Sequence, residues 1–458
     1  MKIAGLSPGR LLLPAAALPI LFVLIFNGVG DVFLVSLSGL LLCAAGLLQK
    51  SPRPDLKIFI PFILYCLVSL LSAFNVYGTI ASGSYVPKQL LFPTLYLLMA
   101  SLGRRQRALL RQMCVFFAVI AAVVSLGQFT VNAVFFDKAG RLGGVLGNPN
   151  ALGIFLVISW FALMHAASGQ KEEYFFFTAI LPHLEPLLLA ALALTLSMGS
   201  FAAMAAGILA ILIKKKRQAS FGEVFRYACR SLAKVSLGVG SGVLLYLTAA
   251  RTDAPWFCLI LLLYIVALAA FWKKLDLFLG EYSKAAAAVS LGGFFVAAVI
   301  MLSRPSSVET FVERLEMMRN GIHYLLRYPV LGIGPGQWRI YNRFSNEKYF
   351  NTWYIHNSLI HVGAELGVTA MALLLAVVVR ILKKDLKPWA KAGCIAFFFH
   401  NLIDTVFFHT GAMTLAIVAF CEPDLQEKEL KGHTAKLLFG AFALVFFYNL
   451  CFYIIKKG

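Results

Sequence analysis

The chain of 458 residues is 60% hydrophobic and only 14% charged, whereas soluble domains carry roughly 25% charged residues. Too few charged side chains remain to cover a water-facing surface, so the composition excludes a soluble globular protein. The net charge of +20 does not indicate nucleic-acid binding. The Lys and Arg residues gather in short segments between apolar runs, as the positive-inside rule expects of a membrane protein.

Apolar runs long enough to cross a hydrocarbon core follow one another along the whole chain. They predict an all-α, polytopic integral membrane protein with about 14 transmembrane helices, since two of the runs are short for a span. In chain order, the predicted spans are 11–28, 32–48, 58–76, 89–102, 113–131, 150–167, 175–195, 199–213, 235–250, 256–272, 284–303, 357–379, 390–408, 410–421 and 436–455.

Basic clusters predict which side of the membrane each connection faces. With the N-terminus inside, the clear clusters all fall on the cytoplasmic side: Lys50–Lys57, Arg104–Arg107, Lys214–Arg217 and Lys383–Lys384. The predicted regions are N-terminal helices (1–131), central helices (132–303) with a cytoplasmic basic segment (214–233), an outer loop (304–356) and C-terminal helices (357–458).

The polar part of the outer loop, 304–355, is basic although it is predicted to lie outside. Its charged residues are Arg304, Arg314, Arg319, Arg327, Arg339, Arg343 and Lys348 against Glu309, Glu313, Glu316 and Glu347. An anionic ligand would explain this excess of positive charge. Apolar residues at helical spacing over 309–327 predict a helix at the membrane interface. The loop has no aspartate, and the eight cysteines show no metal-binding spacing, so we expect neither a metal nor another cofactor.

Residues suited to chemistry gather late in this loop and just after it. The glycine turn Pro329–Gly336 allows the backbone to approach a ligand closely. His356 opens a span at its predicted outer end, where a histidine suits general-base catalysis. Arginines such as Arg314 can hold a diphosphate through forked hydrogen bonds.

These pieces together resemble the O-antigen ligase and polymerase superfamily, the membrane glycosyltransferases of bacterial surface polysaccharides. The resemblance rests on Arg314, on Pro329–Gly336, and on the block from His356-Asn357 to Glu365-Leu366-Gly367. Gly147–Gly153, which opens a span from the predicted outer side, also resembles the family. The resemblance covers about residues 140–420.

The resemblance implies an inverting, metal-independent transferase that moves a glycan en bloc from undecaprenyl diphosphate to an acceptor hydroxyl. It implies a bacterial inner membrane protein, with the active site on the periplasmic face and a large outer loop folded over a cavity. The acceptor would be lipid A core for a ligase, growing polysaccharide for a polymerase, or a protein hydroxyl. His356 would be the catalytic base and Arg314 a diphosphate contact.

Position and charge add Arg319 and Arg141 as further diphosphate-binding candidates. Asn357, Glu365, Gly334 and Asn148 are the supporting residues. One departure stands out: family members usually carry an arginine after Ser or Thr at the outer tip of a mid-chain hairpin, where this chain has Met198 after Ser197. Either another arginine replaces it or the activity differs.

Other readings remain open. A secondary transporter or flippase of a lipid-linked or anionic substrate would use intramembrane ionisable groups, and Asp404 beside His400 and His409 could form a proton relay. His183 and Glu185 could do the same or form a structural contact. A non-catalytic relative is a third reading. His356 could also be only a helix cap, and Arg314 an ion-paired residue.

Overall fold

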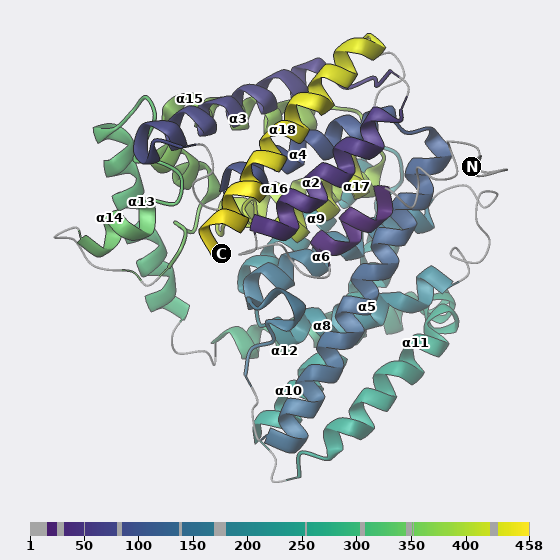
Figure 1. Cartoon of the computed structure of the whole chain (residues 1–458). Coiled ribbons are helices and arrows are strands. Elements are labelled where there is room, and N and C mark those ends of the chain that lie inside the picture. Colours follow the sequence, from purple (N-terminus) through teal and green to yellow (C-terminus); the bar gives the residue numbers. More distant parts are fainter. Residues whose placement is uncertain are drawn as a thin grey trace. The chain divides into compact units, whose positions relative to one another are not determined.

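The computed structural model describes residues 16–24, 32–49, 51–79, 85–136, 140–168, 180–251, 254–302, 307–344, 350, 352–421 and 429–457. Over these segments the protein is helical with short connections and no β-strand (Figure 1). The helices are α2 (Val32–Leu47), α3 (Leu56–Tyr77), α4 (Tyr85–Ser101), α5 (Arg104–Phe136), α6 (Pro149–Ala167), α8 (Glu185–Thr195), α9 (Met198–Lys216), α10 (Phe221–Arg251), α11 (Phe257–Glu281), α12 (Ser283–Leu302), α13 (Ser307–Arg327), α14 (Trp338–Phe344), α15 (Ser358–Lys383), α16 (Pro388–Asn401), α17 (Thr410–Phe420) and α18 (Gly432–Lys457), with short 3₁₀ turns η1 (Gly144–Leu146) and η2 (Leu181–Leu184).

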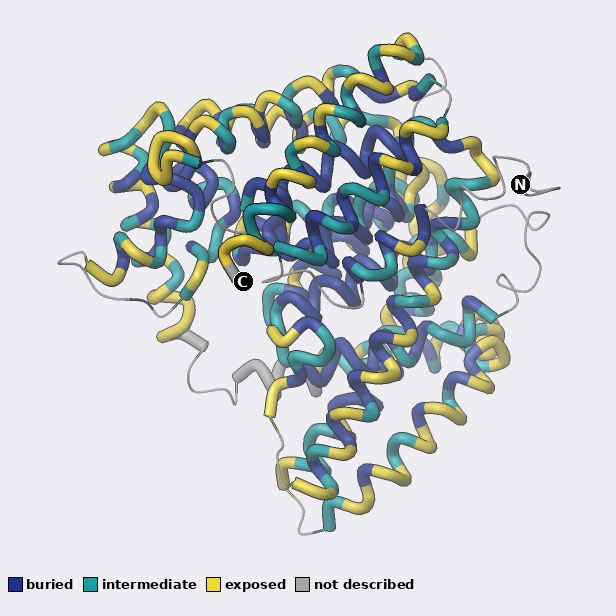
Figure 2. The backbone as a smooth tube through the Cα atoms, in the orientation of Figure 1, coloured by how far each residue is buried: buried dark blue, intermediate teal, exposed yellow. Residues whose placement is uncertain are grey.

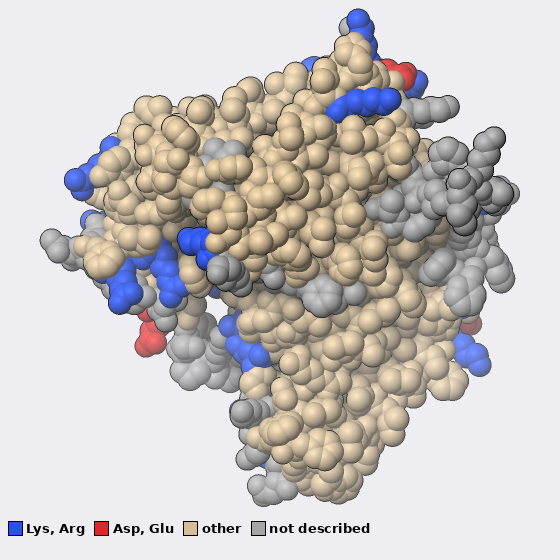
Figure 3. Space-filling view, viewed as in Figure 1, with Lys and Arg blue, Asp and Glu red and all other residues tan. Residues whose placement is uncertain are grey.

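Eight of the described helices are long and apolar enough to cross a membrane: α3, α5, α6, α9, α10, α11, α15 and α18. Three shorter helical segments are also apolar, namely α2, Leu181–Thr195 and α17. Uncharged atoms cover most of the visible surface, and Lys and Arg gather in small groups (Figure 3). Helices suit this setting because each satisfies its own backbone hydrogen bonds without water. The protein is therefore a multi-pass membrane protein.

Two segments differ from the helices expected from sequence. Residues 221–233 of the basic segment 214–233 and the predicted span 235–250 form one continuous helix, α10. Its start is a capping box, in which Ser220 and Glu223 exchange hydrogen bonds. The span predicted over 390–408 is helical only to Asn401, where α16 ends. Residues 402–409 form a non-helical connection to α17, because Asn401 turns its side-chain oxygen to the backbone N–H of Phe407, 2.8 Å away.

The chain forms two compact units, each built from separate stretches of sequence. The first contains residues 1–114, 311–386 and 398–458, and the second contains residues 115–310 and 387–397. Helices α5, α13 and α16 each contribute to both units.

In the first unit, α4 is the central helix, with every residue from Val86 to Ala100 buried (Figure 2). Helix α2 packs on both α4 and α18, while α15 packs on α3. The α2–α18 contact is close because Gly39 and Gly46 lie one above the other on α2. A Cβ at either position would come within about 2.5 Å of the Phe446 or Phe439 ring of α18.

In the second unit, α8 is the buried centre and packs on α6, α10 and α11. Its first residue, Glu185, is 1% exposed. The carboxylate accepts hydrogen bonds from the indole N–H groups of Trp160 and Trp272 at 3.0 and 2.7 Å, and the Lys234 ammonium lies 2.6 Å away. Lys234 and Arg230 also contact Asp276. This network joins α6, α8, α10 and α11 and satisfies a carboxylate that would otherwise be costly to bury.

Candidate functional site

His356 lies in the first unit, immediately before α15, where the following residue fixes its position. Asn357 is the N-cap of α15, and its side-chain oxygen accepts from the backbone N–H groups of Leu359 and Ile360 at 3.0 and 3.1 Å. This is the usual way for an asparagine to open a helix. The Asn357 amide also donates to the carbonyl of Leu402 at 3.0 Å, which ties this helix start to the connection 402–409.

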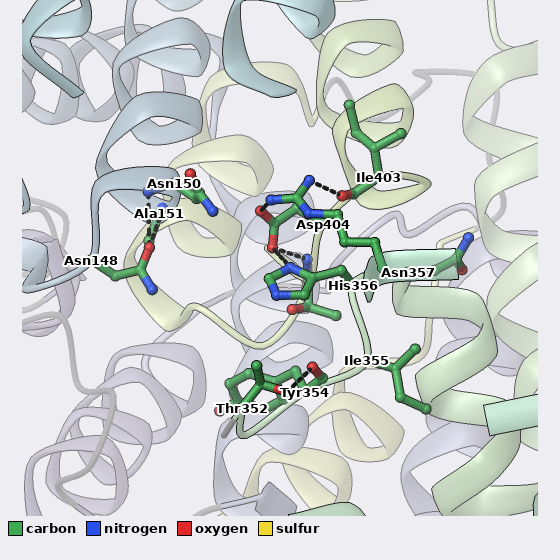
Figure 4. A network of polar contacts seen from close by, with 12 residues as sticks. Asn148, Asn150, Ala151, Thr352, Tyr354, Ile355, His356, Asn357, Ile403 and Asp404 are labelled. Atoms are coloured by element: carbon green, nitrogen blue, oxygen red, sulfur yellow. Dashed lines mark hydrogen bonds and ion pairs between the residues drawn. The ribbon is translucent and has the colours of Figure 1, made fainter. Parts of the chain in front are cut away.

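Asp404, in that connection, is the partner of His356. Nδ1 of His356 lies 2.9 Å from Oδ1 of Asp404 (Figure 4). The same oxygen accepts the backbone N–H of Thr405 at 2.8 Å. Burial alone would raise the pKa of Asp404, but the hydrogen bond from His356 and the charges of His356, His400 and Arg314 hold that pKa below its usual range. Asp404 is therefore an ionised acceptor.

An ionised carboxylate cannot donate, so the proton between the two groups belongs to Nδ1 of His356. In the neutral imidazole, Nε2 then carries the lone pair. No described residue donates to Nε2, and the His356 side chain is 21% exposed. A buried carboxylate that orients an imidazole and leaves its other nitrogen open is an arrangement suited to taking a proton from a substrate.

Arg314, on α13, joins the same cluster. Its guanidinium donates through Nη1 to the carbonyl of Ile403 at 2.8 Å, and Nη2 lies 3.5 Å from Oδ2 of Asp404. Nε is buried and has no hydrogen-bond partner. A guanidinium has five N–H donors, so these contacts leave part of its hydrogen-bonding capacity unused.

Lys88 and His409 lie near each other, and His409 ends the connection that carries Asp404. Lys88, on α4, is 6% exposed and makes no ion pair with the described residues. His409 is 9% exposed, and its Nδ1 has no hydrogen-bond partner. Burial lowers the pKa of His409 to about 4, and the nearby charge of Lys88 acts in the same direction. The unpaired Lys88 ammonium is the kind of buried group that needs an anion.

Lys88 was not among the residues singled out from sequence. It lies directly before the predicted span 89–102. The available signal was that an ionisable residue beside such a run, with no neighbouring acidic residue, indicates function rather than packing.

The glycine turn Pro329–Gly336 packs against a break in α15. Gly332, Gly334 and Gly336 have φ of 66°, 103° and 75°, conformations that favour glycine. A Cβ on Gly332 would come within 2.2 Å of the Glu365 backbone, and one on Gly334 within 2.6 Å of Val76. These glycines are thus required by close approach to the protein's own chain.

Glu365 anchors this turn from α15. Its carboxylate accepts the backbone N–H groups of Gly336 and Trp338 at 2.9 and 3.0 Å, and its carbonyl accepts that of Gly334 at 2.9 Å. Nε2 of His361 is 3.4 Å away from the carboxylate. Glu365 therefore holds the loop that leads into α14 rather than lying with His356 and Asp404.

The remaining predicted residues lie elsewhere. Arg319 is exposed on α13 and has no hydrogen-bond or ion-pair partner among the described residues. Arg141 and Asn148 belong to the second unit. Arg141 donates to the carbonyl of Thr195 at 3.0 Å and to the side chain of Asn150 at 2.7 Å, and Asn148 is the N-cap of α6. Met198 is the first residue of α9.

No group of three or more His, Cys, Asp or Glu side chains in the described part of the chain is arranged to hold a metal ion. The charged groups in contact with one another here are His356, Asp404 and Arg314, and the buried Lys88 lies near His409, at the end of the same connection. With the histidines neutral, Arg314, Lys88 and Asp404 together carry a net positive charge, which suits an anionic ligand. Comparison of the chain with protein-family models and with curated proteins finds no match.

Proposed function

We propose that this protein is a membrane glycosyltransferase resembling the O-antigen ligases and polymerases. It would move a glycan en bloc from undecaprenyl diphosphate to a hydroxyl of lipid A core or a growing polysaccharide. The observation that carries the proposal is the 2.9 Å contact between Nδ1 of His356 and Oδ1 of Asp404, whose other oxygen lies beside Arg314. The buried, unpaired Lys88 near His409 adds positive charge.

In this proposal Nε2 of His356 takes the acceptor's proton as its oxygen attacks the anomeric carbon, and the bond from that carbon to the diphosphate breaks. Attack from the face opposite the leaving group inverts the anomeric configuration. Asp404 holds the imidazole in the required tautomer and stabilises the imidazolium that forms.

Departure of the diphosphate requires positive charge rather than proton transfer. Lys88 and the free donors of Arg314 would stabilise the developing negative charge, and such positioned donors are worth several kcal/mol each in a site that excludes water. Arg319, on α13, remains a further candidate for a diphosphate contact. Family members carry an arginine where this chain has Met198, and Lys88 would supply the positive charge that this arginine provides in them. No metal is required in this scheme.

We further propose that the chain has about 14 spans and lies in the bacterial inner membrane. Loop 304–355 and His356 would then face the periplasm, with the loop folded over a cavity that receives the lipid-linked donor.

The test is an assay of the purified full-length protein with an undecaprenyl-diphosphate oligosaccharide and candidate acceptors, with products identified by mass spectrometry. Wild-type protein should form the transferred glycan in the presence of EDTA, and His356→Ala should lose about 10²–10⁴-fold in rate. His323→Ala, an exposed histidine on α13, is the matched control and should be unaffected. Equal rates for His356→Ala and wild type would rule out the mechanism.

A further inference from the structure

Trp353 is exposed although its neighbours in the chain are packed. It lies three residues before His356, and 60% of its surface is accessible. Tyr354 stacks on Phe408 with ring centroids 5.3 Å apart, and the Thr352 hydroxyl donates to the Tyr354 carbonyl at 3.0 Å. The backbone is thus held on both sides of Trp353, whereas the Trp353 indole is exposed.

The guanidinium of Arg339 covers part of this indole. Its central carbon lies 3.8 Å from the ring centroid of Trp353, a cation–π contact. The described residues contain no carboxylate or carbonyl that accepts from Arg339. Its N–H groups therefore have no acceptor in the described part of the protein.

Both residues are mounted on a rigid frame. Trp338, directly before Arg339, is fully buried in a small core with Tyr324, Phe350 and Ile355, and its backbone N–H donates to Glu365. This core therefore holds the backbone next to Arg339 and Trp353 in place. Little conformational entropy would be lost when a ligand binds them.

An indole face and a guanidinium edge are complementary to different parts of one ligand. The C–H groups on one face of a sugar ring carry partial positive charge and stack on the electron-rich indole. The forked N–H groups of an arginine bind a phosphate or a carboxylate. The pair therefore suits a sugar ring that carries an anionic substituent.

We propose that Arg339 and Trp353 form the acceptor subsite, which binds a phosphorylated or carboxylated sugar next to the hydroxyl that reacts. This inference rests on the proposed transfer at His356. Three residues of extended chain reach at most about 10 Å, roughly the length of two sugar rings. The acceptor's terminal sugar would then lie at His356 and its charged sugar at Arg339 and Trp353.

Trp and Arg also occur together in the interfacial belts of membrane proteins, and the test separates that role from acceptor binding. The purified full-length protein in nanodiscs is titrated with chitotetraose carrying a terminal phosphate, with unmodified chitotetraose and with inorganic phosphate. Binding is followed by saturation-transfer NMR and calorimetry. The wild type should bind the phosphorylated sugar at least tenfold more tightly than either of the other two probes.

Each variant should remove one part of this preference. Arg339→Ala should bind both sugars equally weakly, and Trp353→Ala should lose affinity for both. Matched controls are Trp256→Ala, an indole 52% exposed at the start of α11, and Arg327→Ala, whose guanidinium lies over Tyr328. Both controls should bind as the wild type does.

Several results would overturn the subsite: no sugar binding by the wild type, a preference for inorganic phosphate alone, or unchanged binding by Arg339→Ala and Trp353→Ala. Equal losses in the controls would point to a general interfacial effect and also overturn it. Binding does not require transfer. Sugar binding without any transfer activity would refute the proposed function alone, whereas transfer with unchanged acceptor KM in both variants would refute the subsite alone.

Discussion

His356 and Asp404 are 48 positions apart in the chain, yet Nδ1 of one lies 2.9 Å from Oδ1 of the other. The contact forms because α15 begins two residues after His356, at Ser358, and α16 ends at Asn401, three residues before Asp404. The Asn401 side-chain oxygen also accepts a hydrogen bond from Ser358 at 2.6 Å. Two helix ends thus hold the pair together.

Asp404→Asn should lower the transfer rate almost as much as removal of the base, by about 10²–10⁴-fold. An amide can donate to Nδ1, which would place the imidazole proton on Nε2 and remove the lone pair that accepts the substrate's proton. Initial rates at saturating donor are the measurement, with the exposed Asp385→Asn as control. Because the two residues act as a unit, the double variant with His356→Ala should be no slower than His356→Ala alone. If the rate losses of the two single variants multiplied in the double variant, His356 and Asp404 would not act as a pair.

Lys88→Met should weaken binding of the lipid-linked donor about 10- to 100-fold, the range expected for a lost hydrogen bond to a charged group. The same change should leave the thermal stability of the ligand-free protein unchanged or raised, since it removes an unpaired buried charge. Donor titration and thermal unfolding in detergent measure the two effects. Lys57→Met, on the exposed surface of α3, is the matched control. A large loss of stability would mean that Lys88 is structural.

Gly332→Ala should destabilise the protein by at least about 2 kcal/mol. Its φ of 66° disfavours a side chain, and the new Cβ would come within 2.2 Å of the Glu365 backbone. Gly140→Ala is the control, because a Cβ there meets nothing within 4 Å. Thermal unfolding of the two variants side by side checks the prediction. Wild-type stability in Gly332→Ala would show that the turn adapts.

Stability should fall as the pH drops from about 6.5 to about 4, partly because of His409. Burial lowers the pKa of His409 to about 4, so the unfolded chain takes up a proton in this window before the folded protein does. Each proton that only the unfolded chain takes up lowers the free energy of unfolding by up to about 1.4 kcal/mol per pH unit. Asp404 stays ionised in the folded protein, because its pKa is held below the usual range, and so it contributes only near the lower end of the window, where the unfolded chain begins to protonate it. His409→Gln should therefore flatten the pH profile of thermal unfolding, and an unchanged slope would exclude this role.

The proposed sidedness can be tested with a membrane-impermeant thiol reagent on intact cells. His323→Cys on α13 should be labelled and Ser220→Cys before α10 should not, and both positions are exposed. Of the native cysteines, six are buried and Cys421 and Cys451 are partly buried, so background labelling should be low. Labelling of Ser220→Cys but not of His323→Cys would show that the topology is the reverse of the proposed one.

Local patterns in the sequence predicted local structure well. The apolar spacing over 309–327 predicted a helix, and α13 spans Ser307–Arg327. The segment Gly147–Gly153 was predicted to open a span, and α6 begins there with Asn148 as its N-cap. These features depend on neighbouring residues, and a helix period or a capping side chain is visible in a single stretch of sequence.

Which residues come together in the candidate site could not be predicted from such local patterns. Asp404 was noticed beside His400 and His409, but as a proton relay, because nothing local links it to His356. Lys88 lies on another helix altogether. Hydropathy shows that a helix is buried but not which helices become its neighbours, so contacts between distant segments are invisible to periodicity.

The contact between α2 and α18 has a consequence for how the protein is made. Ribosomes deliver the chain from its N-terminus, so the glycine-lined face of α2 is synthesised roughly 400 residues before the Phe439 and Phe446 rings that cover it. Until α18 has been made, this face of α2 lacks the rings that fill it in the folded protein, so the first unit cannot be completed before α18 is synthesised. A ribosome that stops before α18 releases a chain whose earliest helices have no final partner, which gives membrane quality control a means to recognise it.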